Sequence, residues 1–334
     1  MAVQFLIFAA GLAVLYFSAE WLVRAASSIA LRFGIRPMVA GLTVVAMGTS
    51  MPEFVLNFFA VLADVDALAV GNIVGSNIAN IGLILGLSAV LVPIVVDERT
   101  RRKELTLMVV TMLLFYALAF DGVISRFDGG VLLLGLFAFL ALVVFDARRH
   151  ARENGKALGG SFSRAPETAE LTGVVDAEES RELSGRARIL YLLGGIVGLS
   201  AGAKLMVDSA VSIAEMLNVE PVVIGLSIVA IGTSLPELAA SVVCALKNEG
   251  DMSVGNVLGS NILNVLFVVG LISLMRPLSV EPVAINRHFP VMIAFAVVLF
   301  FLARFRNSIS KGEGAFLLAS FAVYMGWLIY PYVQ

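Results

Sequence analysis

The chain has 334 residues, of which 59% are hydrophobic and only 14% are charged. A typical soluble domain has about 45–50% apolar and about 25% charged residues. Sixteen of the 48 charged residues fall between Asp146 and Arg188, which leaves long uncharged stretches on either side. This composition excludes an ordinary soluble enzyme and predicts a polytopic membrane protein.

Other classes of function lack the residues that they need. The formal net charge of −2 provides no basic patch for nucleic acid. Cys244 is the only cysteine, and the two histidines, His150 and His288, lie in or beside loops. Thiolate metal sites, haem ligation and Ser-His chemistry are therefore excluded. We expect no cofactor and no enzyme activity.

Uncharged stretches of about 20 residues, the length that crosses a bilayer as a helix, define ten candidate spans. The chain begins without the positive segment of a secretory signal, so we expect the first span to be retained. Five spans precede and five follow a charged segment, 147–187, which is predicted to be a solvated linker. The spans are roughly 3–31, 37–62, 68–93, 104–120, 128–146, 188–216, 221–246, 252–275, 288–303 and 314–332.

An internal repeat relates the two groups of spans. Residues 41–93 and 225–277 align without a gap at a shift of 184, with 21 identities in 53 positions. Chance and shared hydrophobicity do not produce such a match. The identical residues concentrate in two motifs, which are Thr-Ser-x-Pro-Glu at 49–53 and 233–237, and Gly-Ser-Asn-Ile-x-Asn at 75–80 and 259–264.

An odd number of spans separates the two copies, so the second copy is expected to enter the membrane from the opposite side. We predict an all-α membrane protein of ten transmembrane helices, arranged as two inverted-topology five-helix repeats, 1–146 and 188–334. A cytoplasmic linker places 18 of the 23 Lys and Arg residues inside and three outside. The positive-inside rule thus predicts a multi-pass protein of the plasma (inner) membrane with both termini outside.

Glu53 and Glu237 are carboxylates deep in apolar segments. An ionised side chain at a helix centre costs at least about 2.5–3.5 kcal/mol unless something pairs with it. Neither glutamate has a cationic residue nearby in its own span. Pro52 and Pro236 cannot donate to the carbonyl groups four residues earlier, which frees two backbone oxygens. A hard cation such as Ca²⁺, which takes about 6–8 oxygen ligands, is the simplest partner for this arrangement.

Hydroxyl and amide groups around these carboxylates complete an oxygen-rich cage. Ser76 and Asn80 are four residues apart, as are Ser260 and Asn264, so each pair lies on one helix face. The GxxxG patterns in the same segments let the neighbouring broken helix approach closely. The remaining candidate ligands are the motif hydroxyls of Thr49, Ser50, Thr233 and Ser234.

Each of these features has a simpler interpretation when it occurs singly. Pro kinks and GxxxG patterns occur in many membrane helices, and a lone buried glutamate can be protonated and hydrogen-bonded. The repetition of both motifs in opposed orientation favours an ion site. By contrast, Glu20 with Arg24 and Lys204 with Asp208 are i,i+4 pairs that we expect to be structural, and Cys244 is expected to be a packing residue.

With these motifs in view, the sequence resembles the cation/calcium exchanger superfamily, specifically its prokaryotic Na⁺/Ca²⁺ exchanger branch with two α-repeats. The resemblance covers all ten spans in order. It implies that Glu53 and Glu237 are the central acidic ligands, with the hydroxyl and amide residues named above around them. It also implies that the backbone carbonyls of Ala46 and Ala230 bind cation, and that the first and sixth spans slide across an eight-helix core.

The sequence departs from that pattern at one position. Members of the superfamily commonly have an aspartate where this chain has Asn264, so the pocket contains two obvious carboxylates and not three. Two negative charges balance one Ca²⁺ or two Na⁺, whereas a third bound Na⁺ would leave the site positive.

The predicted function is secondary active antiport of Na⁺ for Ca²⁺ by alternating access. The expected partners are the two transported ions and the lipid bilayer, and the chain is expected to be monomeric. A cation/proton antiporter is the nearest alternative, because two carboxylates can also exchange protons for Ca²⁺ or Na⁺. A channel is a further alternative, and an intramembrane enzyme is disfavoured because no nucleophile with a base and no cofactor fingerprint is present.

Overall fold

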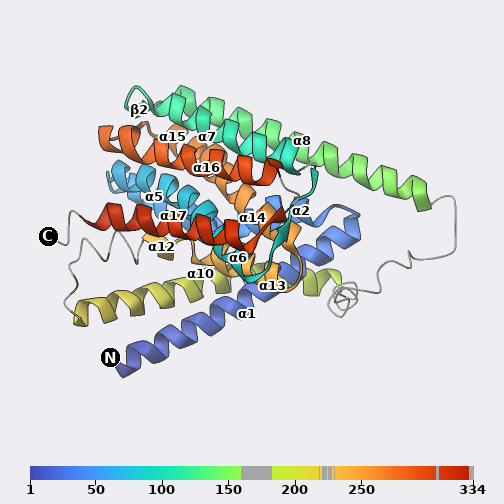
Figure 1. The fold of residues 1–334 in the computed structure, drawn as a ribbon, viewed down its shortest axis with the longest axis horizontal. Coiled ribbons are helices and arrows are strands. Elements are labelled where there is room, and N and C mark those ends of the chain that lie inside the picture. The colour runs from blue at the N-terminus through green and yellow to red at the C-terminus, as the bar shows by residue number, and fades with distance from the viewer. Residues whose placement is uncertain are drawn as a thin grey trace.

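The computed structural model is a bundle of long helices that run in roughly the same direction across the molecule (Figure 1). It describes residues 1–98, 100–158, 183–217, 219, 224, 228, 230–305 and 308–330. Within these residues, seven helices are long and apolar enough to cross a membrane, and a bent helix pair adds an eighth. The chain is therefore a polytopic, mostly helical membrane protein, as its composition predicts.

The first half of the chain contains a long helix, a helix broken near its middle, and three further spans or shorter apolar helices. Several of these helices contain a wider, π-helical segment, denoted η. The elements are α1 (Ala2–Phe33), α2 (Pro37–Ala40), η1 (Gly41–Val45), α3 (Ala46–Thr49), α4 (Met51–Leu62), α5 (Asp66–Ala79), η2 (Asn80–Leu85), α6 (Gly86–Leu91), η3 (Thr100–Glu104), α7 (Leu105–Ala119) and α8 (Arg126–Leu158).

The second half repeats this order of elements. The segment that corresponds by the repeat to 34–45, residues 218–229, lies mostly outside the described part of the chain. The elements are α10 (Gly185–Met216), α12 (Ala230–Gly232), α13 (Leu235–Leu246), α14 (Gly250–Leu263), η5 (Asn264–Val269), α15 (Gly270–Met275), η6 (Ala284–His288), α16 (Phe289–Phe305) and α17 (Lys311–Ile329).

The shift of 184 that aligns the two sequences also aligns the two structures. α5 and α14 have the same length and begin 184 residues apart, and the π-helical segments η2 and η5 follow them at the same distance. The sequence repeat is thus a repeat of local structure. Two of the ten predicted spans contain a short α-helix here, since α7, which continues directly from η3, has 15 residues and α13 has 12.

The helix that contains Pro52 is broken where the sequence predicts. The axes of 37–49 and Met51–Leu62 differ by 42°, and Ser50 at the break has φ −82° and ψ 2°. Proline removes one backbone donor and its ring excludes the straight helix, so the chain turns just before it. Ser234, which precedes Leu235 and Pro236, has nearly the same backbone angles, φ −89° and ψ 5°.

α1 and α10 form a tightly packed pair along one edge of the bundle (Figure 1). Glycines make this close approach possible. A Cβ added at Gly202 would lie 2.7 Å from the backbone nitrogen of Leu15, and one added at Gly195 would lie 2.8 Å from that of Leu22. The first and sixth predicted spans therefore contact each other along their length.

The GxxxG pattern of α14 also serves close packing, against the first half of the chain. A Cβ at Gly255 would lie 2.5 Å from the carbonyl oxygen of Met38, and one at Gly259 would lie 2.5 Å from that of Leu42. This confirms the expected approach of a broken helix for the second copy of the pattern. For Gly71 and Gly75, the segment that is equivalent by the repeat, 222–230, lies mostly outside the described residues.

The prediction of an all-α fold needs a small correction. Four two-residue strands pair antiparallel, β1 (Ile94–Val95) with β4 (Ser308–Ile309) and β2 (Val123–Ile124) with β3 (Leu278–Ser279). Each pair joins a connection of one half to a connection of the other half. Such short pairings satisfy backbone groups in the turns between spans, and no periodicity over two residues could have indicated them.

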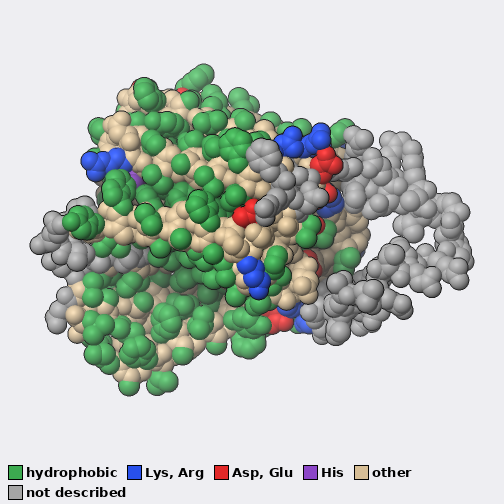
Figure 2. All heavy atoms as spheres, viewed as in Figure 1, with side chains coloured by type: hydrophobic (Ala, Val, Ile, Leu, Met, Phe, Trp, Pro, Cys, Tyr) green, Lys and Arg blue, Asp and Glu red, His purple; other side chains and the backbone are tan. Residues whose placement is uncertain are grey.

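The surface matches a protein surrounded by lipid. Figure 2 shows apolar side chains over most of the visible face, while the charged side chains gather mainly at the end next to the linker. Among the charged residues, Arg36 pairs with Glu104 at 3.0 Å and with Asp146 of α8 at 2.9 Å. Helix extends into both ends of the segment predicted as the linker, because α8 continues to Leu158 and α10 begins at Gly185.

Candidate ion-binding site

The two motif glutamates meet in the interior of the bundle. Glu53 lies in the first turn of α4 and Glu237 in the first turn of α13, just after the two breaks. Their exposed fractions are 0% and 1%, and their carboxyl groups are close enough to interact directly. Among the described residues, no Lys or Arg forms an ion pair with either carboxylate. The fold thus brings two acids together without a basic partner.

Serines of the same motifs lie at the contact between the two halves. Ser50 donates from Oγ to Oε1 of Glu237 at 3.1 Å. Ser234 donates from Oγ to Oγ of Ser76 at 3.4 Å. Each bond joins one half of the chain to the other, so three predicted ligands lie at the contact between the two halves, and one of them bonds directly to a carboxylate.

The motif threonines are held by asparagines that the sequence analysis did not select. Thr49 Oγ1 donates to Oδ1 of Asn256 at 3.2 Å, and Thr233 Oγ1 donates to Oδ1 of Asn72 at 3.2 Å. Asn256 also donates to the backbone oxygen of Glu237 at 3.2 Å. Both asparagines fall in the aligned part of the repeat at a shift of 184, and that identity was the available signal.

Asn80 and Asn264 each begin a π-helical segment, η2 and η5. Both side chains are buried, and each amide nitrogen donates to an asparagine of the other half, Asn80 to Asn261 at 3.1 Å and Asn264 to Asn77 at 3.3 Å. π-helical turns inside α-helices are frequent at functional sites. Here they start at the two amides that the motif spacing selects.

Several buried oxygens of the candidate ligands have no hydrogen-bond donor among the described residues. Burying such a group without a partner is costly, so each one indicates a further interaction. These atoms are both carboxylate oxygens of Glu53, Oε2 of Glu237, Oδ1 of Asn80, Oδ1 of Asn264 and Oγ of Ser260. All are acceptors, and their chemistry fits a hard cation such as Na⁺ or Ca²⁺.

Among the described residues, the structure gives a side-chain hydrogen-bond donor for one of the two backbone carbonyls that the resemblance implies as ligands. The carbonyl oxygen of Ala46 lies in the motif region and accepts from Thr49 Oγ1 at 3.3 Å. Ala230 is the first residue of α12, and its side chain lies outside the described part. Both alanines remain predicted ligands.

The charged pairs outside the site are structural, with one unexpected partner. Lys204 and Asp208 form the predicted i,i+4 pair at 3.0 Å. Glu20, however, accepts from Lys247 at 3.0 Å, which lies just beyond α13. Ser27 of α1 also donates to Glu249 at 2.7 Å. Two polar contacts therefore tie α1 to the connection between α13 and α14. Cys244 is fully buried in the packing between these helices, as predicted.

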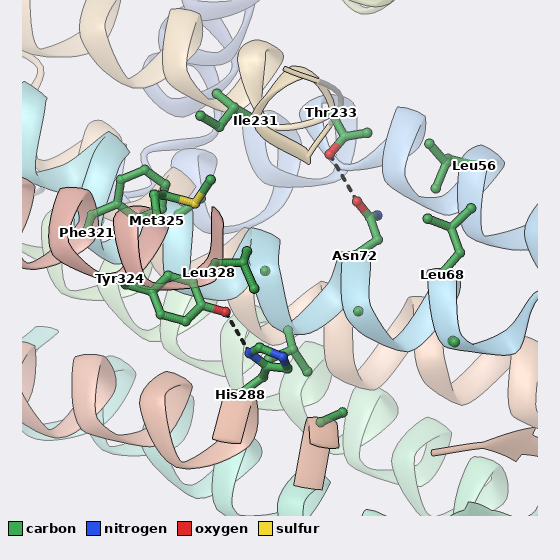
Figure 3. A pocket seen from close by; sticks show the side chains of 16 residues that line it. Leu56, Leu68, Asn72, Ile231, Thr233, His288, Phe321, Tyr324, Met325 and Leu328 are labelled. Carbon is green, nitrogen blue, oxygen red and sulfur yellow. Dashed lines mark hydrogen bonds between the residues drawn. The ribbon is translucent and has the colours of Figure 1, made fainter. Parts of the chain in front are cut away.

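A cavity of about 270 Å³ lies next to the motif threonine of the second half. Figure 3 shows the bond between Thr233 and Asn72 at one side of it and a second bond, between His288 and Tyr324, at another. The rest of the lining is mostly apolar and comes from α4, α5, α12, η6 and α17. The lining includes Leu68 near the start of α5 and Leu328 near the end of α17, so it extends from helix ends to the site.

Comparison with known proteins decides the family. A family model described as sodium/calcium exchanger protein matches residues 3–145 and 188–330. The chain belongs to this family. The match covers both groups of spans and omits the linker, so the recognition made from the two motifs is confirmed. Members of the family are exchangers and not enzymes, which agrees with the expected lack of enzyme activity at the level of the family.

Relatives are similar to the chain over nearly its whole length. The sodium/calcium exchanger MaX1 of Methanosarcina acetivorans is 32% identical over 348 residues, which cover 99% of each chain. A putative antiporter, CaxA of Alkalimonas amylolytica, is 37% identical, with 94% and 95% covered. The inner membrane protein YrbG of Escherichia coli is 35% identical, with 95% and 94% covered.

Solved structures of a sodium-calcium exchanger, NCX_Mj, resemble the fold closely. One, obtained without Na⁺ and Ca²⁺, has a TM-score of 0.77 and 31% sequence identity, and the alignment covers 98% of this chain and 99% of the other. Another, soaked with Na⁺ and Sr²⁺, has a TM-score of 0.78 at the same identity. The exchanger family and its fold are therefore shared over the whole chain.

Proposed function

We propose that the protein is a secondary active antiporter that exchanges Na⁺ for Ca²⁺ across the membrane. The observation that carries this proposal is the cluster of buried acceptor oxygens around Glu53 and Glu237, which have no basic partner among the described residues. A metal cation is the partner that satisfies these atoms. The ions are transported substrates, and the proposal includes no cofactor.

Charge balance explains why the two ions compete. Two carboxylates balance one Ca²⁺ or two Na⁺, so the same oxygens bind either species but not both at full charge. An empty pocket with two negative charges is costly to cover with apolar helices. The loaded pocket is neutral and less costly to cover. Exchange is then obligatory, because the helices can pass over the site only when a cation is bound.

Alternating access is proposed to involve the pair formed by α1 and α10. These helices pack on each other through glycines and touch the remaining helices mainly through α13 and the first broken helix. Displacing them as a unit preserves their own interface. The cavity beside Thr233 supports access of ions from the end of the bundle where α17 ends.

The proposed topology has ten spans in two inverted five-helix repeats, 1–146 and 188–334, joined by a cytoplasmic linker, 147–187. The start of α1 and the end of α17 lie at the same end of the bundle, opposite the C-terminal end of α8 (Figure 1), which supports placing both termini on the outside. The basic residues near the linker support an inner-membrane orientation with the linker inside. We propose that the monomer is the transporting unit, because both halves of the ion site come from one chain.

Flux in proteoliposomes tests the function. The purified protein is reconstituted, and ⁴⁵Ca²⁺ uptake is measured with a Na⁺, K⁺ or proton gradient imposed separately. A Na⁺ gradient alone should drive uptake, and Glu53→Ala and Glu237→Ala should abolish it. Asp121→Asn, at an exposed loop carboxylate that accepts from the backbone of Val123, should leave uptake unchanged. Uptake driven only by a pH gradient would assign cation/proton antiport instead.

A further inference from the structure

The two asparagines of the proposed ion site are each held by a second asparagine from the opposite half of the chain. Asn264 donates from Nδ2 to Oδ1 of Asn77 at 3.3 Å, and Asn80 donates from Nδ2 to Oδ1 of Asn261 at 3.1 Å. All four side chains are at most 1% exposed. The shift of 184 converts one pair into the other, so the same arrangement occurs twice.

Each second asparagine also contacts a methionine sulfur. Nδ2 of Asn77 lies 3.7 Å from Sδ of Met292, and Nδ2 of Asn261 lies 3.5 Å from Sδ of Met108. Both methionines are fully buried, and they too are 184 residues apart. A thioether sulfur accepts hydrogen bonds but cannot donate them. The amide nitrogen of the second asparagine must therefore face the sulfur.

This contact determines how the ligand asparagines are turned. When the nitrogen of Asn77 faces Met292, its oxygen faces Asn264 and can only accept, so Asn264 must present its nitrogen. Oδ1 of Asn264 is then directed away from this pair, and it has no hydrogen-bond donor among the described residues. The same reasoning applies to Oδ1 of Asn80. A reversed amide would present N–H groups to the site and repel a cation.

We propose that Asn77 and Asn261 are positioning residues, which use the sulfurs of Met292 and Met108 as reference acceptors to keep Asn264 and Asn80 turned with their oxygens toward the transported cation. The inference rests on the proposed function, because it takes the cation to lie among these oxygens. It has a specific consequence. A carboxylate has two equivalent oxygens and needs no such orientation, so Asn77 should matter only while residue 264 is an amide.

A double-mutant cycle measures this dependence. Ca²⁺ binding to the purified full-length protein is measured by isothermal titration calorimetry for Asn77→Leu, Asn264→Asp and the double variant. In the native background, Asn77→Leu should weaken Ca²⁺ binding about tenfold, which is the size expected for one reversed or lost ligand. In the Asn264→Asp background, the same change should weaken binding by no more than about twofold, since the two residues are coupled.

Two further variants separate orientation from packing. Met292→Leu conserves volume but removes the acceptor. It should therefore weaken Ca²⁺ binding in the native background and leave it unchanged in the Asn264→Asp background. Asn77→Leu combined with Asn80→Asp is the mismatched control, because Asn80 bonds to Asn261 and not to Asn77. In the Asn80→Asp background, Asn77→Leu should still weaken Ca²⁺ binding as much as it does in the native background. By the same reasoning, Asn261→Leu should weaken Ca²⁺ binding in the native background and have little effect in the Asn80→Asp background.

The outcomes distinguish this inference from the function on which it rests. If the wild-type chain binds Ca²⁺ but Asn77→Leu has the same effect on binding in both backgrounds, the inference alone is overturned. The asparagines are then packing residues. Absence of Ca²⁺ binding by the wild-type chain would overturn the proposed function and the inference together.

Discussion

The hydroxyl of Ser50, in the first half of the chain, donates to Oε1 of Glu237, in the second half, at 3.1 Å. Both residues are almost fully buried. Each motif thus completes its site only when the other half of the chain is present. A hydrogen bond to a charged group is worth more than a bond between neutral groups, about 1.5–3 kcal/mol.

Ser50→Ala should therefore weaken Ca²⁺ binding about tenfold or more, because it removes both a candidate ligand and the donor to Glu237. The measurement is the dissociation constant from calorimetry on purified protein. Ser88→Ala is the matched control. It removes a buried hydroxyl of α6 that lies outside both motifs and has no hydrogen-bond partner among the described residues, and it should leave the dissociation constant unchanged. Equal effects of the two variants would contradict a ligand role for Ser50.

Asn264→Asp should alter the coupling of the exchange. The substitution adds a third carboxylate to a pocket with two, so the loaded site requires one more positive charge for balance. The reversal potential of exchange, measured in proteoliposomes at fixed Na⁺ and Ca²⁺ gradients and varied membrane potential, should shift relative to the native protein. An unchanged reversal potential would reject the idea that pocket charge sets stoichiometry.

Gly255→Ala should destabilise the fold without touching the ion ligands. The new Cβ would lie 2.5 Å from the carbonyl oxygen of Met38 and 2.9 Å from the backbone nitrogen of Leu42, and backbone cannot move aside as a flexible side chain can. Overpacking of this kind costs about 1–3 kcal/mol. Thermal unfolding in detergent should show a clearly lower Tm.

The control for that experiment is Gly130→Ala in α8. No described atom lies within 4 Å of its added Cβ, and alanine favours the helix by about 1 kcal/mol over glycine. The Tm of Gly130→Ala should be equal to or above that of the native protein. A Gly255→Ala variant as stable as Gly130→Ala would contradict close packing between α14 and the first broken helix.

Linking α1 to the end of α13 should stop transport. Glu20 and Lys247 form an ion pair across this contact, so cysteines at these two positions can be joined by a reducible bifunctional thiol reagent. The background is Cys244→Ala, which matches Ala60 of the first half. Na⁺-driven ⁴⁵Ca²⁺ flux should disappear on cross-linking and return on reduction. Each single-cysteine variant, treated in the same way, should keep its flux, and full flux in the cross-linked protein would show that α1 does not move against α13.

The sequence predicted those parts of the site that lie within one motif. The Pro52 break, the burial of Glu53 and Glu237, and the shared face of Ser76 and Asn80 all follow from spacing along a single segment. The repeat supplied the second copy of each. Contacts between helices are different, because the partner of a side chain depends on how two segments cross.

For that reason the roles of Asn77, Asn261 and the two buried methionines were not predicted, although all four positions keep the repeat shift of 184. The contact between Glu20 and Lys247 was missed for the same reason. An i,i+4 rule considers only the residue's own helix, whereas Lys247 approaches from another segment. The short strand pairs are likewise contacts between distant connections.

The central claim is that Glu53 and Glu237 together hold the transported cation. Calorimetric titration of Ca²⁺ into purified protein, with and without Na⁺, tests it most directly. The native chain should bind Ca²⁺ in competition with Na⁺, and Glu53→Gln/Glu237→Gln, which keeps side-chain volume but removes both charges, should bind neither ion measurably while it unfolds at a similar temperature. Ca²⁺ binding of native affinity in that double variant would contradict the account.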